Sequence, residues 1–409
     1  MKIMVANKFH YFRGGSEKVY FDEIELLRKY EHLVIPFSMK NKKNISSKYN
    51  NYFANQLHYE NPKSLKNKIK SFFEIIYSIE SKKKVDYLIK KFKPEIIHGH
   101  NIYGLLTTSI IDSAKKNNLP FLMTIHDYKI ICPNYKLYNG EICEKCEGKK
   151  FYNALIKKCV QNKFMPSLIY TIENLFNLIL KKYEKIDYLI SPSKFLMNKF
   201  IQFGFDPEKI TYIPNFIQID NYNSFYGHNN YFLYFGRIAS EKGIRTLINA
   251  YERLNEKKYK LIIAGDGPLL KKEMEYIKGK DISNIKFLGY ISGRVLEDAI
   301  RKATCIIVPS EWYENCPMTI LEAFAYGKPV IGSNIGGISE LISEAEDGYL
   351  FEPKNVDDLA NKMEIIIRLQ PRIIIEMGKK GREKTRKIFN PDLHYSNLIS
   401  IYKEALINY

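Results

Sequence analysis

Two carboxylates lie close together between Trp312 and Ile331, where Glu314 and Glu322 are separated by seven residues. A helix is predicted to begin near Met318 and to end at Gly327. Glu314 then lies in the loop before this helix and Glu322 lies on it. The two can be a capping carboxylate and a solvated helix residue. They can also accept hydrogen bonds from the hydroxyl groups of a sugar nucleotide, with helix N–H groups on its phosphates.

Two basic residues, Arg237 and Lys242, follow a predicted strand and a glycine turn in the segment YFGRIASEKG. Both precede a helix that is predicted from apolar residues at helical spacing, namely Ile244, Leu247, Ile248, Tyr251 and Leu254. Arginine offers a fork of donors and lysine offers a point charge, so the pair can hold a diphosphate. The alternative is two exposed basic side chains on a loop.

Three further glycine loops follow predicted strands. IIAGDGP contains Gly265 and permits a tight turn or a close approach to the backbone. SNIGGISELI is predicted to open a helix at Ile338 or Ser339. HYFRGGSEKV places Gly14 and Gly15 at a helix N-terminus, where a phosphate can approach. Each loop is a weak signal alone, but together with the basic residues and the glutamates they indicate one binding site.

Short apolar runs alternate with helical patterns, which predicts parallel α/β architecture. The predicted strands are KIMVA, HLVIPF, EIIHGH, PFLMTIHD and DYLISPS in the first half, and YFLYFGRI, KLIIAGDG, IKFLGYI, CIIVPS, PVIGSN and GYLFE in the second. A polar, Asn-rich segment from Tyr212 to Asn230 suggests a boundary between two Rossmann-like domains. Two such domains would place a ligand cleft between the carboxyl ends of their sheets.

Length and composition bound the class of protein. A chain of 409 residues exceeds the size of a single core, so two domains are expected. The formal charge of +18 suits an anionic membrane surface, nucleic acid or an anionic substrate. No nucleic-acid-binding module is recognisable, so nucleic acid is not expected as a partner. Without a signal peptide or an apolar run of spanning length, we expect a cytoplasmic protein, attached at most to the inner face of the membrane.

The motifs resemble those of the family 4 retaining glycosyltransferases, which have the GT-B fold. The resemblance rests on GRIASEKG, GDGP, FLGY, VPSEWYENCPMTILEAFAYGKPVIGSNIGGISELI and DGYLFEP, with GGSEKV, IIHGHN and TIHDY in the first half. It implies an acceptor-binding domain at 1–213 with a Cys-rich insertion at about 130–160, and a nucleotide-sugar domain at 214–385. It also implies a C-terminal helix, 386–409, that packs back on the first domain.

The resemblance also implies roles for individual residues. Arg237 and Lys242 would hold the donor diphosphate, with Gly15 contacting it through the backbone, and Glu322 would accept from the ribose hydroxyls. Glu314 and His126 would contact the donor sugar, while the backbones of Met318 and Thr319 would lie near sugar and phosphate. His126 can instead be a structural hydrogen-bonding residue, and His98 and His100 at the end of their strand would also face the cleft.

One departure from the family pattern concerns Asn315, Cys316 and Pro317, where many relatives have a phenylalanine–glycine step. Proline has no N–H group, so backbone donors would begin at Met318. The resemblance further implies retention of configuration, no metal in the chemistry, and a front-face attack in which the leaving phosphate helps to remove the acceptor proton. A UDP-sugar is favoured over a GDP-sugar as donor, and a saccharide or lipid-linked saccharide is expected as acceptor.

Four cysteines are concentrated in one segment: Cys132, Cys143, Cys146 and Cys159. A CxxC pair flanked by single cysteines can supply four thiolates to a structural zinc ion. Reduced thiols, a redox disulfide and an iron–sulfur site are the alternatives, and an intracellular setting disfavours a stable disulfide.

The segment from Asn61 to Lys93 contains ten lysines and three acidic residues. Its apolar residues fall on one helical face, which is typical of a helix that lies on an anionic bilayer. The alternative is a surface helix whose apolar face packs on its own domain.

Two other functions are compatible with the motifs. A GT-B nucleotide-sugar epimerase would act on the donor without an acceptor. A catalytically silent relative would bind a glycan or a partner enzyme, although it would not need Arg237, Lys242, Glu314 and Glu322 all to be intact.

Overall fold

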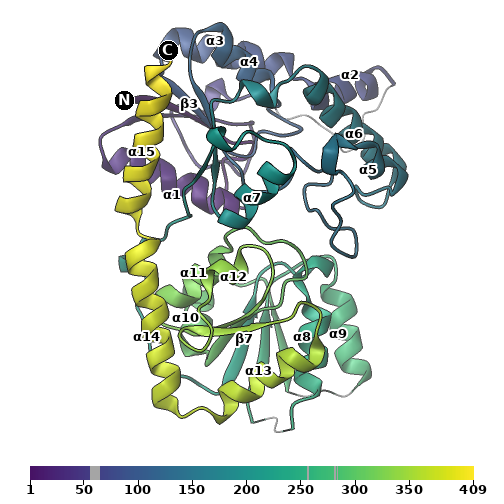
Figure 1. Cartoon of the computed structure of the whole chain (residues 1–409), viewed down its shortest axis with the longest axis vertical. Helices are drawn as coiled ribbons and strands as arrows, with labels where there is room; N and C mark the ends of the chain where they lie inside the picture. Colours follow the sequence, from purple (N-terminus) through teal and green to yellow (C-terminus); the bar gives the residue numbers. More distant parts are fainter. Residues whose placement is uncertain (56–64, 256–257, 281, 283) are drawn as a thin grey trace. The chain divides into compact units, whose positions relative to one another are not determined.

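A computed structural model describes residues 1–55, 65–255, 258–280, 282 and 284–409. The chain forms two compact units. Unit 1 comprises Met1–Leu137, Cys143–Ile213 and Tyr395–Tyr409, and unit 2 comprises Tyr138–Ile142 and Pro214–His394. Each unit is an α/β domain built on a six-stranded sheet whose strands all pair in parallel (Figure 1).

The sheet of unit 1 has the strand order β2-β1-β3-β4-β5-β6. Its strands are β1 Lys2–Ala6, β2 Leu33–Phe37, β3 Ile96–Gly99, β4 Phe121–Thr124, β5 Tyr188–Ser191 and β6 Ile210–Tyr212. Its helices are α1 Gly15–Lys29, α2 Leu65–Ile76, α3 Ile79–Phe92, α4 Ser109–Lys116, α5 Tyr152–Ile156, α6 Phe164–Ile179, α7 Lys194–Gln202 and α15 Pro391–Ile407. Short 3₁₀ helices are η1 Asn50–Tyr52, η2 Glu147–Lys149, η3 Tyr183–Lys185 and η4 Pro207–Lys209.

The sheet of unit 2 has the strand order β12-β11-β10-β7-β8-β9. Its strands are β7 Tyr231–Phe235, β8 Lys260–Ala264, β9 Ile285–Gly289, β10 Cys305–Val308, β11 Val330–Ser333 and β12 Gly348–Phe351. Its helices are η5 Ile219–Asn221, η6 Ser240–Lys242, α8 Ile244–Glu252, α9 Leu270–Gly279, α10 Gly293–Lys302, α11 Met318–Ala325, α12 Ile338–Leu341, α13 Val356–Arg368 and α14 Pro371–Ile388.

All eleven strands predicted from apolar runs are present, because strands of a parallel sheet are covered by helices on both faces and therefore read as continuous apolar segments. The strand that the sequence did not reveal is β6, which has three residues and lies at the edge of the sheet. Its sequence, Ile210–Tyr212, is too short to produce a pattern.

The last helix, α15, belongs to the core of unit 1 although it is far from that unit in sequence. Tyr402 is fully buried in it and contacts the same cluster as β1, β3 and α1. Tyr395 stacks on Tyr30, which follows α1, with 3.6 Å between the ring centroids. Figure 1 shows α15 beside α1. The C-terminal segment therefore completes the first domain.

No helix in the described part of the chain is long and apolar enough to span a bilayer. The predicted basic helix corresponds to α2 and α3, but 61–64 lie outside the described residues. On α2, Ile76 is buried and Phe73 is 62% exposed, so not all apolar residues of this helix pack against the domain.

One lysine of unit 2, Lys328, is only 2% exposed. Its Nζ donates to the carbonyl of Gly227 at 2.8 Å and lies 5.3 Å from the ring centroid of Phe225. Burial, with a contribution from the charge of Arg301, lowers the pKa of Lys328 to about 7. The ammonium form is thus disfavoured in the folded state.

We expect Lys328→Met to change how stability depends on pH. An unfolded lysine has a pKa of about 10.4, so between pH 7 and pH 10 the unfolded chain binds more protons than the folded chain. The free energy of unfolding attributable to Lys328 therefore rises with pH, by up to about 1.4 kcal/mol per unit. Denaturant unfolding should show Lys328→Met more stable than the wild type near pH 7, with the difference shrinking towards pH 10. Lys286→Met, at an exposed position, is the control. A difference in free energy of unfolding between Lys328→Met and the wild type that is the same at all pH values would contradict the expectation.

Candidate functional site

Three of the predicted donor-binding residues of unit 2 lie in loops that follow the strands of its sheet. Arg237 follows β7, Gly265 follows β8, and Glu314 lies in the loop after β10. Because carboxyl ends of parallel strands share one edge, these loops gather there. The sequence predicted this placement, including Glu314 in a loop and Glu322 on the helix α11, which begins at Met318 as expected.

Glycines allow the loops to pack backbone against backbone. Gly265 has φ +142°, and a Cβ atom there would lie 1.8 Å from the carbonyl oxygen of Gly236. Gly243 has φ +67°, and a Cβ atom there would lie 1.8 Å from the carbonyl oxygen of Pro309. Neither position accepts a side chain without displacing backbone. Gly265 is therefore needed for the contact between the β7 and β8 loops, and ligand binding by Gly265 stays a prediction.

Lys242 and Glu314 form an ion pair, with Lys242 Nζ 2.5 Å from Glu314 Oε1. The same carboxylate oxygen accepts from Ser310 Oγ at 2.7 Å, and the Glu314 carbonyl accepts from the N–H of Gly337 at 2.7 Å. The Lys242 Nζ also lies 5.1 Å from the ring centroid of Trp312. Glu314 is buried while the Lys242 side chain is 23% exposed, so an anion from solvent can reach the lysine.

The N-terminus of α11 offers backbone donors next to this pair. Its N-cap is Pro317, whose side chain cannot cap, and the first N–H groups belong to Met318 and Thr319. N–H groups in the first turn of a helix have no acceptor within the helix and favour an anion. The Cys316 carbonyl accepts from Asn215 Nδ2 at 3.2 Å, which holds the turn before the helix. Glu322 follows on the helix and is half-buried.

Arg237 is exposed, as expected for a residue that binds a ligand from solvent. Its backbone carbonyl accepts from the hydroxyl of the buried Tyr234 at 2.7 Å. Burial, with the charges of Glu314 and Glu241, raises the pKa of Tyr234 far above its usual value, so it remains a neutral donor. Tyr234 thus anchors the turn from which the Arg237 side chain extends.

In unit 1, His126 follows β4 and belongs to a cluster of histidines. Its Nε2 lies 2.9 Å from His100 Nδ1. Glu23 Oε1 lies 3.3 Å from His100 Nε2 and 2.8 Å from His98 Nδ1. His98 also contacts Thr124 Oγ1 at 2.8 Å. A buried carboxylate therefore sits behind two histidines, and the second of these contacts His126.

Burial, reinforced by the neighbouring His100, lowers the pKa of His126 well below its usual value. His126 is thus neutral at physiological pH and can accept or donate one hydrogen bond through each ring nitrogen. The expectation that His98 and His100 face a ligand cleft is wrong, because both side chains are fully buried. Inside unit 1, His98 contacts Glu23, Thr124 and Tyr402, and His100 contacts Glu23 and His126.

The ligand atoms of Glu23, His98 and His100 all lie within 4.8 Å of one another, which makes these residues the candidate metal ligands by geometry within the described chain. Their contacts also have a simpler explanation as a hydrogen-bonded cluster, because the second ring nitrogen of each histidine faces Thr124 or His126.

Gly14 and Gly15 lie at the start of α1, as expected: Gly14 is the N-cap and Gly15 the first helical residue. Gly14 is extended, with φ −174°, so its backbone does not require glycine. A Cβ atom there would meet one atom, of Glu17, at 4.0 Å. The absence of a side chain instead leaves room beside the helix N-terminus, where an anion is favoured.

The cysteines of the insertion are all free thiols. Cys132 and Cys146 are buried neighbours, and the hydrogen bond from Cys146 lowers the pKa of Cys132 to about 7, although burial opposes this. Cys143 and Cys159 are half-buried. Across the residues that the structure describes, no three of the four sulfurs lie within 4.8 Å of one another. Binding of zinc by these cysteines stays a prediction.

Sequence reasoning missed several residues of these sites. Ser310 and Trp312 gave no signal, because their contacts with Glu314 and Lys242 depend on the loop conformation. Glu23 did leave a signal: it falls on the apolar face of α1 that carries Tyr20, where a carboxylate needs a buried partner.

Comparison with known proteins agrees with this architecture. The profile for "Glycosyltransferase Family 4" matches residues 13–221, and that for "Glycosyl transferases group 1" matches residues 216–387. An uncharacterized 42.6 kDa protein in the cps region of Klebsiella pneumoniae is 27% identical over 334 residues, which are 80% of this chain and 77% of that protein.

Solved structures show the same fold. Sucrose-phosphate synthase from Thermosynechococcus elongatus has a TM-score of 0.72 at 18% identity, with full coverage of both chains. The Anabaena protein HepE in complex with UDP has a TM-score of 0.69 at 16% identity, covering 99% of this chain and 100% of that one. The two parallel-sheet units have the GT-B architecture, and the matched profile spans more than half of the sequence. The chain belongs to glycosyltransferase family 4.

Proposed function

We propose that this protein transfers a sugar from a UDP-sugar to a saccharide or lipid-linked saccharide, with retention of configuration at the anomeric carbon. The observation that carries the proposal is the Lys242–Glu314 pair at the entrance to α11, in the unit that also exposes Arg237 after β7. Two similarities support it: HepE was solved with UDP, and the Klebsiella relative is a protein of a cps region. A GDP-sugar is the second candidate donor.

The donor diphosphate would be bound by Arg237, Lys242 and the first N–H groups of α11. An incoming diphosphate competes with Glu314 for the Lys242 ammonium group, which is partly exposed. Glu314 can then accept from a hydroxyl of the sugar, and Glu322 from the ribose. Positive groups aimed at the leaving diphosphate stabilise the charge that develops as the glycosidic bond breaks. These groups supply that charge without requiring a metal.

Attack would occur on the face from which the diphosphate leaves. The acceptor oxygen bonds to the anomeric carbon, the bond from that carbon to the diphosphate oxygen breaks, and the acceptor proton passes to the diphosphate. Glu314 is not assigned as a covalent nucleophile, because with the donor bound its carboxylate would accept from Ser310 Oγ and from a sugar hydroxyl. Configuration is retained because the new bond forms on the same face.

His126 would contact the donor sugar in a tautomer chosen by its neighbours. An ionised Glu23 favours a proton on the His100 nitrogen that faces it, at 3.3 Å. A neutral His100 then presents Nδ1 as an acceptor to the Nε2–H of His126, at 2.9 Å. This leaves His126 Nδ1 without a proton, so that it can accept from a sugar hydroxyl.

We also place the reaction at an anionic membrane surface. The net charge of +18 favours it, and several apolar side chains of unit 1 are exposed, among them Phe73 (62%), Ile156 (70%) and Met165 (58%). They lie on α2, α5 and α6, which pack on one another.

Thermal unfolding with UDP, GDP and ADP tests the donor site. A ligand that binds only the folded state stabilises it by about 2.7 kcal/mol at a hundred times its dissociation constant. We expect UDP to raise the unfolding temperature of the wild type and to have little effect on Arg237→Ala or Glu322→Ala. Arg294→Ala, an exposed position in the same unit, should respond like the wild type. An equal shift in Arg237→Ala would refute the assigned site.

Product analysis then separates the enzyme classes. With a UDP-sugar and an acceptor, a transferase gives a glycoside whose anomeric configuration, read by NMR, matches that of the donor. An epimerase changes the sugar of the donor when no acceptor is present. A protein that binds nucleotide but turns over neither would be a silent relative.

The role of Glu23 can be tested through a double-mutant cycle. At metal sites, removal of a carboxylate that orients a histidine typically costs about 10–100-fold in activity, and we expect a loss of similar size in kcat/KM for Glu23→Gln. In a protein that already carries His126→Gln, adding Glu23→Gln should cost much less, because the orienting effect has no target. Glu25→Gln, exposed on the same helix, should leave kcat/KM unchanged. Fully additive losses would mean that Glu23 acts only on stability.

A further inference from the structure

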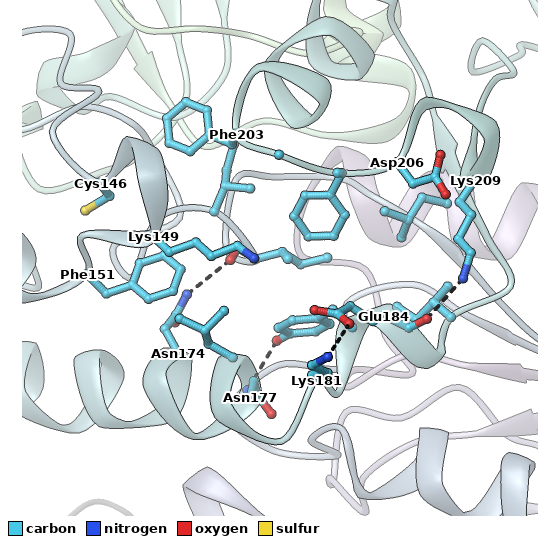
Figure 2. Close-up of a pocket in the computed structure, with 18 residues that line it drawn as sticks. Cys146, Lys149, Phe151, Asn174, Asn177, Lys181, Glu184, Phe203, Asp206 and Lys209 are labelled. Atoms are coloured by element: carbon cyan, nitrogen blue, oxygen red, sulfur yellow. Dashed lines mark hydrogen bonds and ion pairs between the residues drawn. The ribbon is translucent and has the colours of Figure 1, made fainter.

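Unit 1 contains a pocket whose lining residues include none of the histidine cluster. Its volume is about 400 Å³, within the range of ligand-binding pockets, about 300–1,000 Å³. The loop after β4, the end of α6, η3, the start of β5 and the loop between α7 and η4 form its walls (Figure 2). All of the lining residues belong to unit 1.

The walls are mainly apolar. Side chains that line the pocket include Ile131, Leu178, Ile186, Leu189, Phe203 and Phe205. Two buried amides of α6, Asn174 and Asn177, also reach it, but their polar atoms are used within the protein. Asn174 donates to the carbonyls of Lys129 and Ile130, at 3.1 and 3.3 Å. A ligand body in this space would therefore be stabilised by burial of apolar surface.

One cation at the pocket is not used by the protein. In Figure 2 the Lys149 side chain extends across the pocket. Within the described residues its ammonium group has no hydrogen-bond or ion-pair partner. The other cations at the lining have protein neighbours: Lys181 lies 4.0 Å from the Glu184 carboxylate in a solvent-exposed pair, and Lys209 Nζ donates to the Glu184 carbonyl at 3.2 Å.

The remaining acid at the lining is also satisfied. Asp206 caps η4, accepting from the N–H of Glu208 at 3.0 Å. Lys149 is exposed, so its solvated ammonium group is available to the anionic group of a ligand whose apolar part fills the pocket.

A second, open hollow adjoins the pocket and shares Lys149, Phe203 and Gly204 with it. Lys150 and Glu147 lie on its rim, so that two lysines face one glutamate there. The two spaces differ in character, since one is lined by apolar side chains and the other is open to solvent with a positive balance. This suits a molecule with an apolar body and an anionic head.

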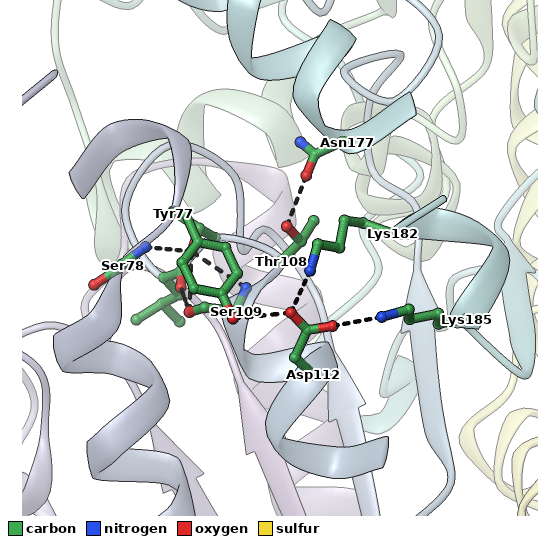
Figure 3. A network of polar contacts seen from close by, with 10 residues as sticks. Tyr77, Ser78, Thr108, Ser109, Asp112, Asn177, Lys182 and Lys185 are labelled. Atoms are coloured by element: carbon green, nitrogen blue, oxygen red, sulfur yellow. Dashed lines mark hydrogen bonds and ion pairs between the residues drawn. The ribbon is translucent and has the colours of Figure 1, made fainter. Parts of the chain in front are cut away.

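The wall formed by the end of α6 is held in place by a polar network (Figure 3). Asn177 accepts from Thr108 Oγ1 at 2.7 Å. Just beyond α6, Lys182 pairs with Asp112, which also accepts from Lys185 at 2.9 Å. Burial acts to raise the pKa of Asp112, but the hydrogen bonds from the two lysines outweigh it and lower the pKa. A pocket with fixed walls binds without a cost of ordering them.

We propose that this pocket binds an amphiphile with an alkyl or prenyl chain and one phosphate group. The chain lies among Leu178, Phe203 and Phe205, and the phosphate lies on Lys149 and Lys150. A neutral lipid would gain nothing from the two lysines, and inorganic phosphate would gain nothing from the apolar walls. The proposal concerns binding alone and does not depend on transferase activity.

Titration calorimetry on the full chain tests the proposal, using decyl phosphate, decanol and inorganic phosphate as probes. We expect one molecule of decyl phosphate to bind per chain. Decanol should bind about tenfold more weakly, because it lacks one charge-assisted hydrogen bond, and inorganic phosphate should not bind. Equal affinity for decanol and decyl phosphate would overturn the assignment of the phosphate to the lysines.

Two substitutions locate the ligand. Leu178→Trp should fill the pocket and abolish binding of decyl phosphate, whereas Ile179→Trp, at the next residue but 75% exposed, should not. Lys149→Gln should lower the affinity for decyl phosphate about tenfold, to the affinity for decanol, whereas Lys163→Gln should leave it unchanged.

Unfolding temperatures verify that each variant is folded, and Lys149 is exposed, so its substitution does not disturb the core. Decyl phosphate binding that survives both Leu178→Trp and Lys149→Gln would place it on the protein surface and overturn the proposal.

Discussion

The candidate donor site depends on how closely the loops at one edge of the unit 2 sheet approach each other. At Gly265 and at Gly243, a single added carbon would lie 1.8 Å from a carbonyl oxygen of the facing loop. At Gly336 it would lie 2.5 Å from the carbonyl oxygen of Glu314. These contacts join the loops that follow β7, β8, β10 and β11. Because none of them leaves space for a side chain, the separations of the loops are fixed, and so is the position of Glu314.

The protein uses the same pair of residue types for different purposes according to solvent access. Lys242 and Glu314 pair where the lysine is 23% exposed, so the ammonium can exchange its partner for an anion from solvent. Lys129 and Glu173 pair at 2.9 Å with side chains only 3% and 2% exposed. Breaking such a buried pair leaves an uncompensated charge, which makes it a fixed structural link.

The second of these pairs holds the loop after β4 to α6. Lys129 Nζ also donates to the Pro133 carbonyl at 3.2 Å and to Asn174 Oδ1 at 3.0 Å. The same loop carries His126 and, further on, the cysteines and Lys149. A structural ion pair therefore positions a segment that contains both a proposed catalytic residue and one wall of the apolar pocket.

The order of the elements and the identity of the donor-site motifs were readable from the sequence. Parallel strands are buried on both faces, so each appears as an apolar run, and eleven of them were recognised in this way. Glycine, arginine and lysine after those runs predicted one candidate donor site, because the ends of parallel strands share an edge. The start of α11 at Met318, between the two glutamates, was also predicted correctly.

What the tertiary structure decided is which side chains meet. No sequence pattern joins His98 to Tyr402, which is 304 residues away, yet their side chains lie 2.7 Å apart because α15 completes the core of unit 1. The burial of His98 and His100 was likewise invisible, since a histidine at a strand end reads the same whether it faces solvent or the interior. The apolar pocket is formed by five segments that are separated in sequence. Local propensity determines an element from neighbouring residues, whereas burial and partner choice depend on packing between distant ones.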